Sequence, residues 1–281
     1  MPEIITVINM KGGVGKTTLS VNLAYLLAYE HDKNVLLLDI DPQFNATQYV
    51  ANQGEILQHF QNKKTVYDIL MPKKEEEISL STKKKTTKKQ DVDLSDYLIN
   101  VFDYSGAGKL DLIPSSLKLI NFETSKRGVE NRLKKFLNSE CSHYDYIIID
   151  CPPTLTLLTL SAYLASEYYL IPIKPDFLSS LGLPLLQRGL NEYEETYNHS
   201  LKLLGIVFTM VNIRPNATQQ IMNEISQGGW QCLENYSRHS TKVASSVHSL
   251  EDFYYYAHSA EYADEFRNIT QEILGKINEL K

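Results

Sequence analysis

The chain has 281 residues, of which 43% are hydrophobic and 22% are charged, a composition typical of folded proteins that excludes wholesale disorder. Its 28 Lys and Arg residues against 34 Asp and Glu residues give a formal net charge of −6, which excludes coating of nucleic acid by bulk positive charge. Cys141, Cys151 and Cys232 have unrelated spacings and predict neither a disulfide framework nor a zinc ribbon. We therefore expect a cytoplasmic protein, without a signal peptide or a membrane-spanning run.

Short apolar runs alternate along the chain with longer segments of helical periodicity. In chain order, we expect a strand over 4–9, a helix over 17–29, a strand over 34–39, a short strand within 110–116, a helix over 117–137, a strand over 144–150, a helix over 155–165, a strand over 168–173, a helix over 181–197, a strand over 203–212 and a helix over 216–225. Strands separated by helices predict a mostly parallel sheet flanked by helices, the doubly wound α/β fold. In such folds ligands bind at the carboxyl ends of the strands.

A polar stretch at about 72–96 interrupts this alternation. It contains the acidic triplet Glu75–Glu77, followed by a lysine run, Lys83, Lys84, Lys85, Lys88 and Lys89. We expect a solvated insertion in a single domain that spans residues 1–281. The alternative is a basic hook for nucleic acid or a partner, although the acidic triplet would partly cancel its field.

A glycine-rich loop joins the first predicted strand to the first predicted helix. Residues 9–18 read NMKGGVGKTT, which is the strand–loop–helix context of a phosphate-binding loop. Glycines at 12, 13 and 15 let the backbone turn tightly and aim N–H groups at phosphate oxygens. Lys16 is expected to reach the β- and γ-phosphates of ATP, and Thr17 to ligate Mg²⁺. The expected nucleotide contacts in the loop are Lys11, Gly12, Gly13, Val14, Gly15, Lys16, Thr17 and Thr18, although Met10 stands where the strict motif has its first glycine.

A second lysine, Lys11, stands at the front of this loop, where one nucleotide in one subunit does not need it. With it, KGGVGKTT resembles the deviant Walker A motif of the ParA/MinD family of P-loop ATPases. In that family the first lysine reaches across a nucleotide-sandwich dimer to the partner's phosphates. The resemblance therefore implies a homodimer that closes around two ATP molecules, with Lys11 and Lys16 as catalytic residues.

Further motifs resemble the same family in the same order. Residues 36–43 are similar to its second-strand motif and imply that Asp41 orients the attacking water, with Asp39 nearer the metal; capping of a turn is the alternative role for Asp41. Residues 147–153 resemble the Walker B strand, in which Asp150 would hold Mg²⁺ through a water. Residues 174–183 resemble the loop that helps form the dimer face. Asn212 matches the position that recognises adenine, although Asn also favours turns.

Residues 65–70 and 110–116 look more like ParA than MinD, and no helix-turn-helix segment precedes the first strand. The resemblance is therefore to small, single-domain ParA proteins. It implies ATP-dependent, sequence-independent binding to DNA on the nucleoid, and partition of a plasmid or chromosome with a ParB-like adaptor. Positioning of a protein cargo on the nucleoid is the alternative.

Residues 237–245 are similar to the family segment whose basic residues contact the DNA backbone. Lys242 falls on the best-matched position and Arg238 lies nearby, while Arg214, Lys202 and Arg267 are weaker candidates. The alternative is that Arg238 and Lys242 only solvate a loop.

The sequence argues against three other classes of protein. A MinD-like membrane ATPase needs a C-terminal anchor with a basic polar face. The C-terminal segment has an apolar stripe, formed by Phe266, Ile269, Ile273, Ile277 and Leu280, but its polar face is acidic. We therefore expect the stripe to pack in the core, and no membrane partner is expected. A bacterial tyrosine kinase would use residues 254–256, which we expect instead in a strand or packed edge; Lys11 also argues against a kinase. A nitrogenase-reductase needs cluster-binding cysteines, whereas Cys141 and Cys151 are expected to be small buried hydrophobes.

Overall fold

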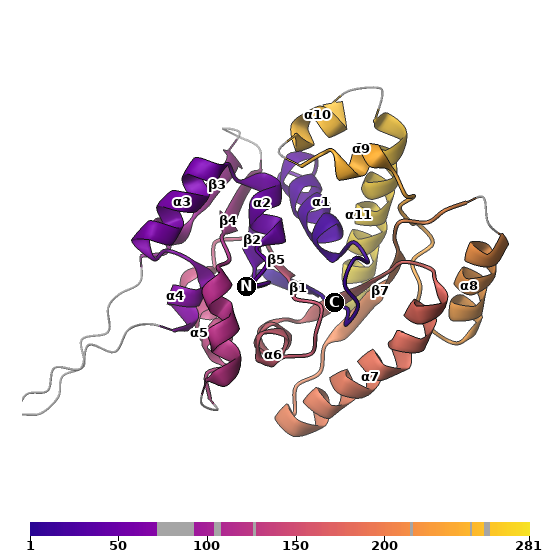
Figure 1. Cartoon of the computed structure of the whole chain (residues 1–281), viewed down its shortest axis with the longest axis horizontal. Helices are drawn as coiled ribbons and strands as arrows, with labels where there is room; N and C mark the ends of the chain where they lie inside the picture. Colours follow the sequence, from indigo (N-terminus) through magenta and orange to yellow (C-terminus); the bar gives the residue numbers. More distant parts are fainter. Residues whose placement is uncertain (72–92, 104–107, 126–127, 214–215, 248, 256–258) are drawn as a thin grey trace, which may run out of the picture.

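The computed structural model describes residues 1–71, 93–103, 108–125, 128–213, 216–247, 249–255 and 259–281 (Figure 1). Most of the predicted insertion at 72–96, including its lysine run, lies outside the described residues, as does Arg214. Among the described helices, none is long and apolar enough to cross a bilayer.

A seven-stranded sheet forms the centre of the molecule, in the spatial order β3-β4-β2-β5-β1-β6-β7. Its strands are β1 (Glu3–Val7), β2 (Asn34–Asp39), β3 (Ile99–Asp103), β4 (Lys109–Ile113), β5 (Tyr146–Asp150), β6 (Tyr168–Ile173) and β7 (Lys202–Phe208). All neighbouring pairs are parallel except β3 and β4, which are antiparallel. The predicted fold class is therefore confirmed, and the edge strand β3 is an addition to it.

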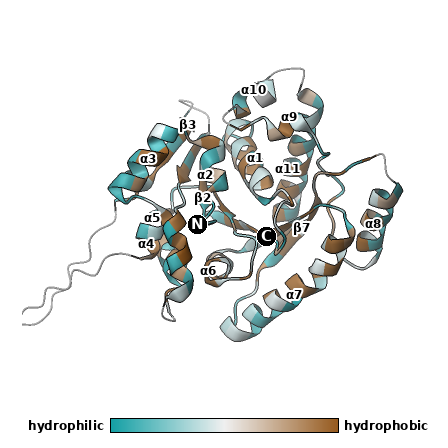
Figure 2. Ribbon diagram, viewed as in Figure 1, coloured by the Kyte–Doolittle hydropathy of each residue, from teal (hydrophilic) through white to brown (hydrophobic). Residues whose placement is uncertain are grey.

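Helices cover both faces of the sheet (Figure 1). They are α1 (Lys16–Tyr29), α2 (Asn45–Val50), α3 (Gln53–Asn62), α4 (Val66–Leu70), α5 (Arg132–Glu140), α6 (Leu157–Ala165), α7 (Phe177–Tyr197), α8 (Asn216–Gln227), α9 (Thr241–Ala244), α10 (Leu250–Tyr255) and α11 (Ala260–Leu280), with two 3₁₀ helices, η1 (Leu94–Tyr97) and η2 (Leu117–Thr124). The central strand β5 contributes side chains to the cores on both faces of the sheet. Ile148 packs with α1 and α11, while Ile147 and Ile149 pack with α5 and α6. Alternate residues of one apolar strand thus bury opposite faces of the sheet, and Figure 2 shows the helices turning their hydrophobic sides inward.

One predicted helix is wrong, and so is the strand alternative for Tyr254. The single helix expected over 117–137 is the 3₁₀ helix η2 followed by α5, which begins only at Arg132. Gly128 lies between them with φ of 96°, a left-handed conformation that interrupts a helix. Tyr254 lies in helix α10 and not in a strand, and its ring stacks on Tyr25 of α1 with centroids 5.2 Å apart. Helical geometry buries one tyrosine of the cluster and exposes the next, Tyr255.

The C-terminal helix α11 packs in the core, as its apolar stripe predicts. Phe266, Ile269, Ile273 and Ile277 are each at most 2% exposed, and Leu280 packs against the same cluster. The apolar face that a membrane anchor would need is therefore occupied by the protein's own sheet. Cys141 and Cys151 are likewise buried, as expected.

A segment after α8 extends the sheet beyond β7. Cys232 forms a parallel bridge with Ile206, and Arg238 forms one with Val211. Carboxylates of α11 hold the outer side of this segment, because Glu272 accepts hydrogen bonds from the N–H groups of Glu234 and Asn235, at 2.7 and 3.0 Å. The short helix α9 follows directly and is thereby placed near the carboxyl end of β7 (Figure 1).

Candidate functional site

The glycine-rich loop lies between β1 and α1, at the carboxyl end of a central strand. Gly13 and Gly15 have φ of 69° and 80°, a left-handed backbone that other residues rarely adopt. Two contacts anchor the loop: the Asn9 amide donates to the carbonyl of Pro172 at 2.7 Å, and the Thr209 hydroxyl donates to the carbonyl of Val14 at 2.6 Å. The loop is therefore held open by neighbouring strands.

The Lys16 ammonium points back into this loop and donates to the carbonyl of Lys11 at 3.0 Å. Lys16 is only 7% exposed, and this burial lowers the pKa of its ammonium although the charges of Asp150 and Asp41 oppose the shift. A poorly hydrated cation at the mouth of an anion-binding loop has little water to lose when an anion arrives. Lys16 thus lies at the glycine-rich loop, and its contact with phosphate stays a prediction.

Asp150, at the end of β5, accepts hydrogen bonds from two hydroxyl groups of α1. Thr17 Oγ1 lies 2.7 Å from Oδ2, and Ser20 Oγ lies 2.9 Å from Oδ1. Complete burial raises the pKa of Asp150 to about 6, although these hydroxyls and Lys16 pull it down. A buried carboxylate beside the Thr17 hydroxyl matches the oxygen donors that Mg²⁺ prefers.

Asp39 and Asp41 follow one another at the end of β2 but have different surroundings. Asp39 is fully buried and accepts from the Thr47 N–H and hydroxyl, both at 2.8 Å, and from the Asp41 N–H at 3.1 Å. Burial, and then the charge of Asp150, raise the pKa of Asp39 well above its usual value. Its hydrogen bonds fix the loop that presents Asp41, so Asp39 acts on this loop as a scaffold.

Asp41 itself lines a cavity of about 430 Å³ in front of the glycine-rich loop. Its Oδ1 accepts from the Gln43 N–H at 2.9 Å, and its carbonyl accepts from the Ser115 hydroxyl at 2.6 Å. In the described part of the chain, Oδ2 of Asp41 has no protein partner. This oxygen is the one available to a water in the cavity.

The lining of this cavity shows which predicted residues the fold brings together. It consists of Gly12, Gly13, Gly15, Lys16, Thr17, Thr18, Asp41, Gln43, Asn45, Gln48, Tyr49, Pro153, Met210 and Val247. Val14 is buried behind the loop, and Asn212 is exposed and outside the lining, so its contact with adenine stays a prediction. Tyr49, Met210 and Val247 had no signal in the sequence, although Met210 has φ of 51°, a strained conformation typical of functional sites.

Within the described residues, no group of three His, Cys, Asp or Glu side chains is arranged to hold a metal ion. Mg²⁺ rarely uses such all-protein cages and is commonly bound by one or two protein oxygens together with phosphates and waters. The hydroxyl of Thr17 and the carboxylate of Asp150 fit that mode of binding.

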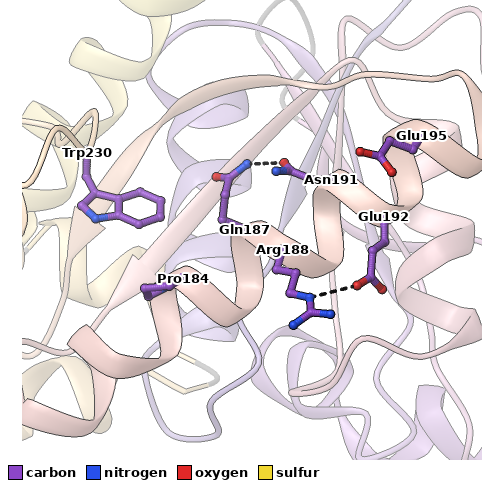
Figure 3. Close-up of a pocket in the computed structure, with 7 residues that line it drawn as sticks. All are labelled: Pro184, Gln187, Arg188, Asn191, Glu192, Glu195 and Trp230. Atoms are coloured by element: carbon purple, nitrogen blue, oxygen red, sulfur yellow. Dashed lines mark hydrogen bonds and ion pairs between the residues drawn. The ribbon is translucent and has the colours of Figure 1, made fainter.

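A second cavity, of about 500 Å³, lies between α7 and Trp230 (Figure 3). Its side chains are largely paired with one another, Gln187 with Asn191 and Arg188 with Glu192. None of its lining residues belongs to the glycine-rich loop or to the aspartates behind it. This second cavity is therefore not the phosphate site.

Lys11 extends away from the cavity to Asp176, which precedes α7. Its ammonium lies 2.6 and 2.7 Å from the two carboxylate oxygens and 3.3 Å from the Ser179 hydroxyl. Burial favours the neutral acid, but hydrogen bonds from Lys11 and Ser179 nevertheless lower the pKa of Asp176. Four large apolar side chains on the first turns of α7 are exposed next to this pair, namely Phe177, Leu178, Leu181 and Leu185; we call them the α7 ridge.

The two predicted DNA contacts have different surroundings. Arg238 forms ion pairs with Glu265 and, at 2.6 Å, with Glu261. Lys242 is exposed on α9, and its ammonium lies 5.6 Å from the ring centre of Tyr262. Arg238 thus holds the segment to α11, while Lys242 keeps its side chain at the surface.

A phosphate-binding loop at the end of β1, with a buried lysine, a hydroxyl and aspartates at the ends of neighbouring strands, defines the class of P-loop ATPases. The sequence matches the family described as AAA domain over residues 2–203. With its second loop lysine, the chain belongs to the ParA-type, deviant Walker A branch of these ATPases.

Two curated relatives have similar sequences. The chain is 36% identical over 232 residues to the sporulation initiation inhibitor protein Soj of Bacillus subtilis, which covers 81% of this chain and 80% of Soj. It is 31% identical over 228 residues to the chromosome partitioning protein ParA of Myxococcus xanthus, covering 79% and 70% of the two chains. A plasmid partition protein of Borrelia burgdorferi bound to AMPPNP has a similar structure, with a TM-score of 0.76 and 28% identity over 98% of this chain and 100% of that one.

Proposed function

We propose that this protein is a Mg²⁺-dependent ATPase whose ATP-bound form is a sandwich homodimer that binds DNA without sequence preference. With a ParB-like adaptor, it would segregate plasmid or chromosomal DNA on the nucleoid. The observation that carries the proposal is the position of Lys11: it belongs to the phosphate loop, yet its side chain leaves the cavity for the protein surface.

Nucleotide binding follows from the geometry of the loop. Backbone N–H groups of residues 12–17 surround the phosphates, and Lys16 exchanges the carbonyl of Lys11 for a phosphate oxygen. The hydroxyl of Thr17 and the carboxylate of Asp150 would hold Mg²⁺. When bound, the cation neutralises charge that develops on the phosphate oxygens. Because Asp150 is buried with a raised pKa, it gains from a nearby cation, which favours its ionised form.

Hydrolysis needs a water held in line with the γ-phosphate. Asp41 lines the cavity and is 6% exposed, and one of its carboxylate oxygens is already engaged by the Gln43 N–H. The second oxygen orients the water. The chain of hydrogen bonds from Thr47 through Asp39 to the Asp41 N–H keeps this carboxylate in place.

Dimerisation is supported by the surface that surrounds Lys11. The α7 ridge exposes four large apolar side chains in succession, and contiguous apolar surface of this kind marks an interaction site. The ridge begins one residue after Asp176, so a second copy that covers it also comes within reach of Lys11. Binding of ATP would shift the equilibrium toward the dimer, because the γ-phosphate is a stronger partner for Lys11 than an exposed carboxylate.

DNA binding is supported by Lys242 and by the names of the relatives, two of which are partition proteins. One exposed lysine in a protein of net charge −6 binds DNA weakly. A dimer carries two copies of Lys242, one from each subunit, on one rigid body. The two contacts with DNA therefore reinforce each other. Affinity for DNA therefore depends on ATP through the dimer.

Static light scattering with Mg·ATP and with Mg·ADP tests the proposal. We expect the wild type to dimerise with ATP only, Lys16→Ala to lose ATP binding, and Lys11→Ala to bind ATP but remain a monomer. Asp41→Ala should dimerise, bind DNA and fail to release phosphate. A normal dimer of Lys11→Ala would refute the cross-subunit role, and normal turnover by Asp41→Ala would refute its role toward water.

A further inference from the structure

The nucleotide cavity is connected to α9 by one buried tyrosine. Tyr49 of α2 lines the cavity and is 7% exposed. Its hydroxyl lies 2.7 Å from Ser246 Oγ and 3.3 Å from the carbonyl of Val243, both at the C-terminal end of α9. α2 follows the loop that carries Asp41, so a single side chain joins this loop to the helix that carries Lys242.

The Tyr49 and Ser246 hydroxyls share the carbonyl of Val243 as an acceptor. When Ser246 Oγ donates to this carbonyl, at 2.8 Å, it accepts from the Tyr49 hydroxyl. Burial raises the pKa of Tyr49, which keeps this hydroxyl protonated. Ser246 is 2% exposed, so loss of the donor cannot be made good by bulk water.

A second buried contact joins the phosphate loop to the same part of the chain. Asn22 of α1 is fully buried; its amide donates to the carbonyl of Thr18 at 2.7 Å, and its oxygen accepts from the Tyr254 hydroxyl of α10 at 2.5 Å. Thr18 lines the cavity. The elements on either side of Ser246, α9 and α10, are therefore each bonded to a helix that contacts the cavity.

The segment 241–247 also reaches the cavity directly, because Val247 follows Ser246 and lines the cavity. Lys242 lies near the other end of this segment, where the Ser240 hydroxyl caps α9 by accepting from the Lys242 N–H at 3.1 Å. A nucleotide that fills the cavity would contact both Tyr49 and Val247. Buried hydrogen-bond networks of this kind are rigid.

We propose that Tyr49 is a positioning residue that transmits occupancy of the nucleotide cavity to α9, and so sets the orientation of Lys242. The inference rests on the proposed function where it concerns DNA. Its first step, from Tyr49 to α9, is independent of DNA, because it concerns only the response of this chain to nucleotide.

The test compares wild type with Tyr49→Phe, which keeps the ring in the cavity wall and removes only the hydroxyl. Tyr163→Phe is the matched control, because Tyr163 is 2% exposed and its hydroxyl donates to the carbonyl of His199 at 2.7 Å, away from α9. Amide hydrogen exchange at residues 241–247 is measured with and without Mg·AMPPNP. We expect nucleotide to slow exchange in wild type and Tyr163→Phe, and this effect to shrink by roughly two- to tenfold in Tyr49→Phe, the factor of one buried hydrogen bond.

A DNA arm separates the two proposals. With ATP, Tyr49→Phe should bind DNA roughly two- to tenfold more weakly at an unchanged salt slope, because no phosphate contact is removed. Ser246→Ala should cost less in the Tyr49→Phe background than in wild type, since the contact between the two groups is already lost and only the hydrogen bond to the carbonyl of Val243 remains to be removed. If wild type fails to bind DNA, the proposed function is wrong while the exchange result still judges Tyr49. Three results would each overturn the role of Tyr49. They are wild-type protection of residues 241–247 in Tyr49→Phe, an equal loss of protection in Tyr163→Phe, and no response to nucleotide in the wild type.

Discussion

The ammonium of Lys11 lies 2.6 Å from Oδ1 of Asp176 in the same chain. The lysine that the proposed dimer requires at the partner's nucleotide is therefore held by its own subunit. Asp176 also caps α7, because its Oδ1 accepts from the Ser179 N–H at 2.9 Å. After release of Lys11, this carboxylate would keep the Ser179 N–H as a partner.

Asp176→Asn should therefore favour the dimer. Asn remains a good helix cap, while the charge that holds Lys11 is removed. Both side chains of the pair are about one-third exposed, at 32% and 36%, and exposed ion pairs contribute little. We expect the ATP concentration at half-maximal dimerisation to fall by about two- to fivefold. The measurement is light scattering over an ATP titration. Glu192→Gln breaks the exposed pair with Arg188 on the same helix and should have no effect; a dimer weakened by Asp176→Asn would contradict the prediction.

Asp150 should make the nucleotide-free protein less stable at neutral pH. Its folded pKa of about 6 lies above the ordinary value of 3.8 because the site is buried. The folded state thus binds the proton more tightly than the unfolded state, and ionisation costs stability as the pH rises from about 4 through 6. Asp150→Asn should raise the free energy of unfolding by about 1–3 kcal/mol at pH 7.5, with the gain disappearing toward pH 4.

Urea unfolding of both proteins at several pH values measures this difference, in the absence of Mg²⁺ and nucleotide. Asp145→Asn is a suitable control, because this carboxylate lies at the opposite end of β5 and accepts from the Asn34 N–H at the surface. A gain in stability of Asp150→Asn that persists unchanged at pH 4 would show that burial of the ionised carboxylate is not its cause.

The sequence predicts best those site residues that are adjacent in the chain or that end predicted strands. The glycine-rich loop, Lys16 and Thr17 are adjacent in the chain, and Asp41 and Asp150 end apolar strands that a parallel sheet brings to one edge. Tyr49 and Val247 lie almost two hundred residues apart and meet only through packing of α2 on α9, which no local pattern encodes. Strand β3 was missed for a related reason, since an antiparallel edge strand with exposed residues lacks the continuous apolar run of the central strands.

Packing of α11 in the core can be tested by truncating one of its buried side chains. Ile273 is fully buried, and Ile273→Ala removes apolar contacts and leaves a cavity. We expect the free energy of unfolding to fall by about 2–5 kcal/mol. Gln271→Ala on the exposed side of the same helix should change it by less than about 0.5 kcal/mol. Chemical denaturation measures both. Equal, small effects would mean that the apolar stripe is available to another surface.

Salt dependence should separate the two basic residues near α9. Phosphate contacts release counterions, so each contact adds about −0.9 to the slope of log affinity against log salt. Lys242→Ala removes one contact per subunit and should flatten the slope of the dimer by about 1.8. Arg238 is engaged with Glu261 and Glu265, and hydrogen bonds to these carboxylates raise its pKa further. Arg238→Ala should leave the slope unchanged and lower stability by about 1–2 kcal/mol, since Glu261 and Glu265 lose the guanidinium and only the backbone N–H of residue 238 still donates to Glu265.

The measurement is fluorescence anisotropy of a duplex of scrambled sequence over a salt series. The background is Asp41→Ala with Mg·ATP, because a dimer that does not hydrolyse ATP stays on DNA long enough to titrate. Lys276→Ala is the control, since this lysine pairs with Glu279 on α11 at 2.9 Å. Because Lys242 is exposed on α9 whereas Arg238 is half-buried in ion pairs with Glu261 and Glu265, only the first substitution should alter the slope. A flattened slope in Arg238→Ala would reverse the assignment, and an unchanged slope in both would transfer the DNA contact to the lysine run at 83–89.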